Sequence, residues 1–244
     1  MKKVIITLLL VISISFASVA QKEKINFNLK FGFIKGGEAE LIITDTIFNN
    51  KRAKHYYLMG RTTGLPDKLF AVNDVYETTV DYQTRLPLKS IRNIKEGRYQ
   101  WYNETLYYQD TDSIYSQKSG GRSVPENLLD IVSVFFYFIN HYLTDDVQQG
   151  LEVTMPTYHA DDISDVTVKY LGDQTIETDI GKVECYKLAP VVDKGKVLKR
   201  SDGLVFYVSK NSKLPILLEF DMRVGALRAE VQSYEVNGKE QAFK

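Results

Sequence analysis

The stretch from Ser123 to Thr144 reads S-V-P-E-N-L-L-D-I-V-S-V-F-F-Y-F-I-N-H-Y-L-T, and it is the only long part of the sequence whose pattern favours a helix over a strand. Ser123 and Glu126 have the S-x-x-E spacing of a capping box, in which each side chain satisfies a backbone donor at the start of a helix. Pro125 falls in the first turn, where its missing N–H costs nothing. The sequence therefore predicts one long helix over about residues 124–144.

The surface of this predicted helix is apolar over more than half of its circumference. Its polar positions, Asp130, Asn140 and His141 among them, step by three and four residues and form one narrow stripe. A membrane span needs roughly 20 mostly apolar residues, and the polar stripe interrupts this segment. We therefore expect a helix that does not cross a membrane and that packs on or inside a curved sheet.

The segments on both sides of the helix alternate between apolar and polar residues, which is typical of strands with one buried face. Residues 25–33 and 39–43 predict a first hairpin around a turn at Gly36-Gly37. Residues 109–122 are polar and contain a Gly pair, so they are predicted to be a loop. The pattern favours a mainly β fold, an antiparallel meander that forms a curved sheet or an incomplete or closed barrel.

The N-terminus has the three parts of a secretory signal peptide: the basic Lys2-Lys3, an apolar run, and small residues at Ser18 and Ala20. We predict a signal peptide over residues 1–20 and a single β-rich domain over residues 21–244. The protein is then expected to be exported, either to the periplasm or to the cell surface, and not to span the membrane once the signal is removed.

The predicted domain also contains a faint internal repeat. T84-R-L-P-L-K-S before the helix is similar to S212-K-L-P-I-L-L-E after it. This similarity is consistent with two similar sheet halves that flank the helix, residues 21–120 and 145–244. It is equally consistent with coincidence in a β-rich chain.

Charge and cysteine content exclude several classes of protein. Without Lys2 and Lys3, the 31 basic residues fall to 29 against 31 acidic residues. Nucleic-acid binding needs a concentrated basic surface, which this balance does not provide. The single cysteine, Cys185, cannot form an intrachain disulfide, and its place in an alternating stretch predicts a buried structural thiol.

No stretch of the sequence carries a catalytic or cofactor motif. The nucleophile elbow, the phosphate-binding loop and the dinucleotide fingerprint are all missing from the printed sequence. His55, His141 and His159 lie far apart, whereas a zinc site needs three or four converging ligands. We therefore predict no cofactor, no metal and no enzymatic activity. An enzyme would require Asp130, His141 or His159 to converge with other polar groups in one cleft.

Aromatic residues are concentrated at residues 99–108 and 135–142. They indicate either a solid core under the helix or an apolar cavity between helix and sheet, the kind of place where ligands usually bind. The predicted ligand-binding residues are Trp101, Phe135, Tyr137, Phe138, Asn140 and His141. Tyr137, Asn140 and His141 would form the polar edge of the cavity.

Several segments together resemble a family of exported bacterial proteins grouped as domain of unknown function 3108. These segments are F70-x-V-N-D-V-Y-E-T-T-V-D with T84-x-L-P, E126-N-L-L-D-I-V-S-V-F-F-Y, L171-G-D-Q-T-I-E-T-D-I-G-K-V-E-C, L204-V-F-Y-V-S and L214-P. The chain departs from the family pattern at Phe206, where Trp is frequent, and in its F-F-Y-F-I-N-H run, where Tyr and Arg often close the helix. The resemblance implies a location in the cell envelope and a β architecture, and it implies no reaction.

Two functional hypotheses follow. The first is a non-catalytic binding protein of the cell envelope that shelters an apolar small molecule or lipid between the helix and a curved sheet. The alternative is a structural or interaction module of the envelope, with a solid core and a protein partner. A void beside Phe135 and Phe138 would favour the first hypothesis.

Overall fold

The mainly β class is confirmed by the computed structural model, in which 67% of residues are strand and 9% are helical. The structure describes residues 21–191, 203–221 and 226–243. The predicted signal peptide, residues 1–20, lies outside the described residues.

Residues 22–123 form eight strands and a short helix. They are β1 (Lys22–Phe31), β2 (Ile34–Phe48), β3 (Lys51–Thr62), α1 (Gly64–Leu69), β4 (Asn73–Asp81), β5 (Pro87–Glu96), β6 (Tyr99–Tyr108), β7 (Ser113–Ser116) and β8 (Gly120–Ser123). Each strand pairs antiparallel with the next, as short turns between alternating segments require.

The second part of the chain contains the longer helix and the remaining strands. They are β9 (Leu129–Asp130), α2 (Ser133–Tyr142), β10 (Glu152–His159), β11 (Asp162–Thr178), β12 (Gly181–Val191), β13 (Leu204–Ser209), β14 (Pro215–Asp221), β15 (Ala226–Val236) and β16 (Lys239–Glu240). Strands β10 to β15 form a second antiparallel meander, and β9 adds to β10 in parallel.

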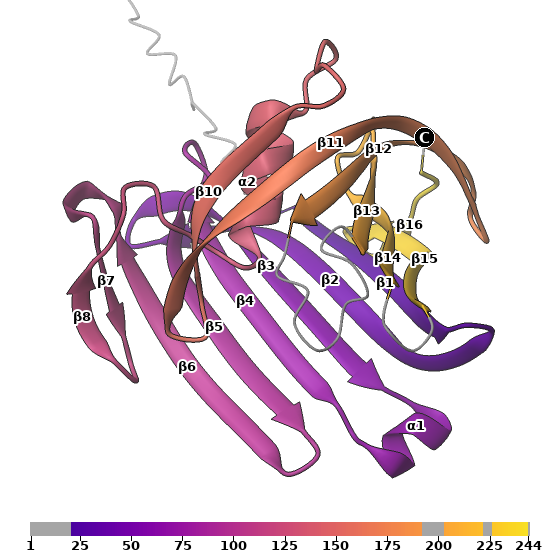
Figure 1. Ribbon diagram of the computed structural model, residues 1–244, viewed down its shortest axis with the longest axis horizontal. Coiled ribbons are helices and arrows are strands. Elements are labelled where there is room, and N and C mark those ends of the chain that lie inside the picture. The colour runs from indigo at the N-terminus through magenta and orange to yellow at the C-terminus, as the bar shows by residue number, and fades with distance from the viewer. Residues whose placement is uncertain (1–20, 192–202, 222–225, 244) are drawn as a thin grey trace, which may run out of the picture.

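The two meanders join into one large sheet because β1 pairs with β15, with Ile25 opposite Tyr234. The strand order is β8-β7-β6-β5-β4-β3-β2-β1-β15-β14-β13-β12-β11-β10-β9, so the sheet is open. Figure 1 shows how strongly it curves and how α2 lies within the curve. The similarity of the two halves that the sequence echo suggested stays a prediction.

The two ends of the open sheet approach each other through side chains. Tyr107 of β6 and Tyr158 of β10 meet edge to face, with ring centroids 6.3 Å apart. These two rings form a small apolar cluster with Ile114 and Leu128. Hydroxyl groups of Ser116 and Ser119 also donate to the Asp161 carboxylate. We call this side-chain contact the seam.

The main core fills the concave face of the sheet. Ile25 and Phe27 of β1, Leu41 of β2 and Val231 of β15 are buried there together with Phe138 of α2. On β1 and β2 they alternate with exposed or half-buried residues, as the two-residue period of a strand dictates. Burying a side chain of this size contributes about 1.5–3 kcal/mol.

Helix α2 is shorter than predicted, because it begins at Ser133 and not near residue 124. Ser123 lies at the end of β8, and residues 129 and 130 pair with β10. Reciprocal capping bonds form instead between Asp130 and Ser133: the Ser133 N–H donates to Asp130 Oδ1 at 3.1 Å, and the Asp130 N–H donates to Ser133 Oγ at 2.8 Å. Leu129 and Asp130 therefore pair with the sheet, and the helix begins after them.

Two other local predictions were wrong. The first hairpin turns at Gly32-Phe33, and Gly36-Gly37 lies inside β2, where the register shifts. A Cβ atom on Gly37 would lie 2.4 Å from the Arg61 carbonyl oxygen, so glycine is needed there for close strand packing. Residues 109–122 form a short 3-10 turn (Gln109–Thr111) followed by the β7–β8 hairpin.

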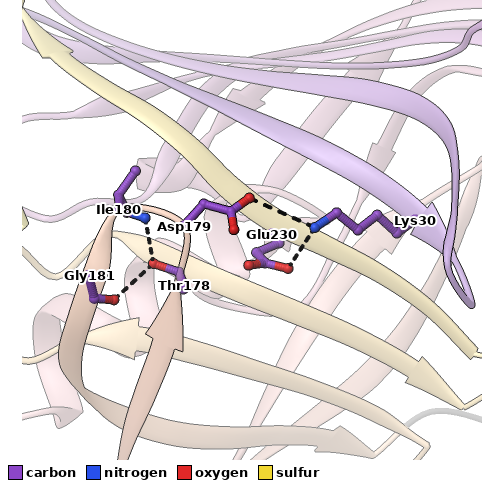
Figure 2. Close-up of polar contacts among 6 residues, drawn as sticks. All are labelled: Lys30, Thr178, Asp179, Ile180, Gly181 and Glu230. Carbon is purple, nitrogen blue, oxygen red and sulfur yellow. Dashed lines mark hydrogen bonds and ion pairs between the residues drawn. The ribbon is translucent and has the colours of Figure 1, made fainter.

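The long β11–β12 hairpin bends over and reaches strands β1 and β15 (Figure 2). At its tip, Thr178 Oγ1 donates to the Gly181 carbonyl and accepts from the Ile180 N–H. Lys30 Nζ lies 3.3 Å from the Glu230 carboxylate and 4.0 Å from that of Asp179. Lys30 therefore connects the hairpin tip to the middle of the sheet.

Candidate apolar binding cavity

A cavity of about 340 Å³ lies between α2 and the concave face of the sheet. Every described residue that lines it is apolar. The lining consists of Phe27, Ala39, Leu41, Leu58, Ile131, Val132, Val134, Phe135, Phe136, Val166, Val168, Leu188, Pro190, Leu204, Phe206, Pro215, Leu218, Phe220 and Ala229.

Aromatic rings on α2 hold the helix against the sheet beside this cavity. The Phe136 ring stacks on Tyr56 of β3 at 4.1 Å between centroids. Phe135 packs against Phe206 of β13 at 4.9 Å. Because Phe135 and Phe136 are adjacent and point to strands of different halves of the sheet, the helix is fixed on two sides while space remains between them.

The chemistry of the lining determines what the cavity can hold. Ligand pockets commonly have volumes of about 300–1,000 Å³, and this one falls within that range. Water is stable in a cavity only where two to four polar partners are available, whereas apolar cavities stay dry and bind apolar molecules. The cavity is therefore suited to an apolar group, such as a hydrocarbon chain.

Of the six predicted site residues, only Phe135 lines this cavity. Phe138 is 1% exposed and belongs to the core beside it. Tyr137, Asn140 and His141 do not form a polar edge: the His141 ring stacks on Tyr137 at 4.1 Å, and Asn140 donates to the Phe136 carbonyl at 2.6 Å. Asn140 and His141 are exposed on the side of α2 away from the core.

Trp101, the sixth predicted residue, lies in a separate crevice at the seam. This crevice holds about 30 Å³ and is lined in part by Arg92, Asn103, Asp130 and His159. Ile131 and Val132 line both the crevice and the apolar cavity. The structure thus brings Asp130 and His159 into one crevice and leaves His141 outside it.

Burial shifts the pKa of Asp130 and of His159, the two residues of this crevice that the sequence analysis named as candidate catalytic groups. Burial raises the pKa of Asp130, although hydrogen bonds from Thr78, Ser133 and Val132 oppose the shift. Burial also lowers the pKa of His159, with a further contribution from the charge of Arg92. Both side chains are therefore driven toward their neutral forms.

Most of the lining could not be predicted from the sequence, because those residues are distributed over ten elements or loops. Phe135 was predicted, and Phe206 also carried a signal, since it departs from the family pattern. The other lining residues of β11 to β15 are ordinary members of alternating strands, and only the curvature of the sheet directs them to the same space.

The described residues offer no alternative site for a metal or a reactive thiol. No group of three or more His, Cys, Asp or Glu side chains gathers among them in a way that could hold a metal ion. Cys185 is fully buried, and burial raises its pKa to about 12. In the part of the chain that the structure covers, no helix has the length and apolar character needed to cross a membrane.

Comparisons with known proteins bear on the family of the chain. No curated protein and no solved structure matches it. A family model described as "Protein of unknown function (DUF3108)" matches residues 26–232, which is well over half of the chain. The match agrees with the resemblance of the sequence segments, and the chain belongs to the DUF3108 family.

Proposed function

We propose that this protein is a non-catalytic binding protein of the cell envelope that shelters an apolar ligand, such as a lipid chain, between α2 and the curved sheet. The observation that carries the proposal is the apolar cavity of about 340 Å³. A location outside the cytoplasm is part of the proposal and is supported by the signal-peptide pattern of residues 1–20.

The cavity favours ligand binding over a purely structural role. The cavity leaves a contiguous apolar surface beside the helix uncovered. Large uncovered apolar surfaces mark sites where a ligand or partner binds, and a concave apolar surface of this volume suits a small apolar molecule.

Native mass spectrometry of the protein purified from its host tests the proposal. We expect a bound apolar molecule of defined mass that is released when the protein unfolds. The substitution Ala229→Phe should abolish this species, because Ala229 is 7% exposed and lines the cavity from β15. Ala39→Phe, which fills the cavity from β2, provides a second variant in case one of them folds poorly.

Ala226→Phe is the matched control. It places the same ring on the same strand at an exposed position, three residues before Ala229. The control should keep the bound molecule. A homogeneous ligand-free wild-type protein that also takes up no added lipid would overturn the proposal.

A further inference from the structure

The crevice at the seam contains two N–H groups that lack a hydrogen-bond acceptor among the described residues. Arg92 Nε and Trp101 Nε1 are both buried and have no hydrogen-bond acceptor in the structure. Arg92 makes no ion pair among the described residues, and its guanidinium lies 6.0 Å from the Trp101 ring. A buried donor without an acceptor costs about 1–3 kcal/mol, so these groups are suited to an acceptor that comes from a ligand.

Strand register shows why these donors face the same space. Arg92 of β5 is directly opposite Asn103 of β6 and Tyr76 of β4. Trp101 is two residues before Asn103, so its side chain lies on the same face of β6. His159, at the end of β10, completes the crevice from the other end of the sheet, and its ring lies parallel to that of Tyr76.

The charges around the crevice favour an anion. Two acidic residues, Glu77 and Asp130, line it, and neither forms an ion pair with Arg92. Glu96, four residues along β5, interacts with the charge of Arg92 but forms no ion pair with it among the described residues. Glu77 alternates with Tyr76 along β4 and contacts His55 at 2.9 Å, which places its carboxylate on the other face of the sheet. Both oxygens of Asp130 already accept hydrogen bonds, from Thr78 on one side and from backbone N–H groups on the other. Lys118 adds a second cation, 4.7 Å from the Trp101 ring.

Size limits the group that the crevice can accept. The crevice holds about 30 Å³, which is room for a small group. A carboxylate is a compact acceptor with two oxygens for two donors, whereas a sugar or a phosphodiester head is larger. Arg is particularly suited to carboxylates because its planar fork matches their geometry.

The crevice and the apolar cavity border the same turn. Ile131 and Val132, which precede α2, line both spaces. The two spaces therefore adjoin at this turn. We propose that the ligand is a long-chain carboxylic acid whose tail occupies the apolar cavity and whose carboxylate accepts hydrogen bonds from Arg92 and Trp101. This inference rests on the proposed function, since it needs the cavity to hold a tail.

Titration calorimetry with dodecanoate, dodecanol and acetate distinguishes the contribution of the carboxylate head to binding from that of the hydrocarbon tail. Wild-type protein should bind dodecanoate about 10- to 100-fold more tightly than dodecanol, the factor expected for hydrogen bonds to a charged group. Acetate should show no measurable binding, because it has no tail to bury. The substitution Arg92→Met should remove the preference for dodecanoate and leave the affinity for dodecanol unchanged.

Two further variants keep the test decisive if Arg92→Met folds poorly. Trp101→Phe removes only the indole N–H and an aromatic edge, and it should weaken dodecanoate binding alone. Arg92→Lys keeps the charge without the fork and should restore part of the preference. Arg98→Met is the matched control, since Arg98 is exposed in the β5–β6 turn, and it should bind like the wild type.

The outcomes distinguish this inference from the proposed function. Equal affinity of the wild type for dodecanoate and dodecanol, or a preference that survives both Arg92→Met and Trp101→Phe, overturns the head-group site and leaves the apolar cavity intact. Failure of the wild type to bind either molecule overturns the proposed function, and the head-group site with it.

Discussion

At the scale of single residues, Asp130 has the most contacts that fix the position of α2. Its Oδ1 accepts from the N–H groups of Val132 and Ser133, and its Oδ2 accepts from Thr78 of β4 at 2.6 Å. It also pairs with Tyr158 of β10 through the backbone. The Asp130 side chain thus connects the start of the helix to β4, and its backbone connects the same turn to β10.

The substitution Asp130→Ala should lower the free energy of unfolding by about 1–3 kcal/mol, because it removes a helix cap and leaves the Thr78 hydroxyl without its acceptor. Urea unfolding followed by circular dichroism measures the change. Asp130→Asn keeps an acceptor oxygen for the cap and should cost less. Equal losses for the two variants would contradict the role assigned to the cap.

The lowered pKa of His159 determines how the free energy of unfolding should depend on pH. Its folded pKa lies below the ordinary value of 6.5, so the unfolded chain binds more protons as the pH falls through that value. The free energy of unfolding of the wild type should therefore fall, relative to His159→Gln, as the pH drops below about 6.5, by at most about 1.4 kcal/mol per pH unit. Above that pH the difference should stay constant. A difference that is flat from pH 7.5 to 5 would refute the assignment.

At the scale of elements, local patterns predicted the strands well and the helix poorly. The strand character of β1 and β2 follows from alternation, although the turn between them lies at Gly32-Phe33 and not at Gly36-Gly37. The beginning of α2 could not be predicted in this way, because Leu129 and Asp130 are taken into the sheet by pairing with β10, a strand more than 20 residues later. The S-x-x-E pattern at Ser123 was a genuine local signal that tertiary pairing overrode.

The tip of the β11–β12 hairpin gives a prediction at the same scale. Replacing Lys30 by Met should cost about 1–3 kcal/mol, because Glu230 is only 9% exposed and would lose its cation. Asp179→Asn should cost less than about 1 kcal/mol, because that carboxylate is largely exposed and lies farther from Lys30. Thermal unfolding of both variants provides the comparison. A larger loss for Asp179→Asn than for Lys30→Met would contradict the role of Lys30.

At the scale of the whole molecule, the sequence predicted a curved antiparallel sheet with a buried helix but not which strands join its two meanders. The pairing of β1 with β15 joins residues that are about 200 positions apart, and no local pattern carries that information. The seam is equally non-local, since Tyr107 meets Tyr158 only after both meanders have formed. The cavity depends on both features, which explains why one of six predicted site residues lines it.

The most direct test of the central claim, that an apolar ligand occupies the space between α2 and the curved sheet, is a crystal structure of the protein with ω-bromododecanoate, in which the bromine gives an anomalous signal. We expect a bromine peak inside the cavity, beside Phe135, Phe206 and Ala229. A cavity filled by the protein's own side chains, or a bromine peak found only on the outer surface, would contradict it.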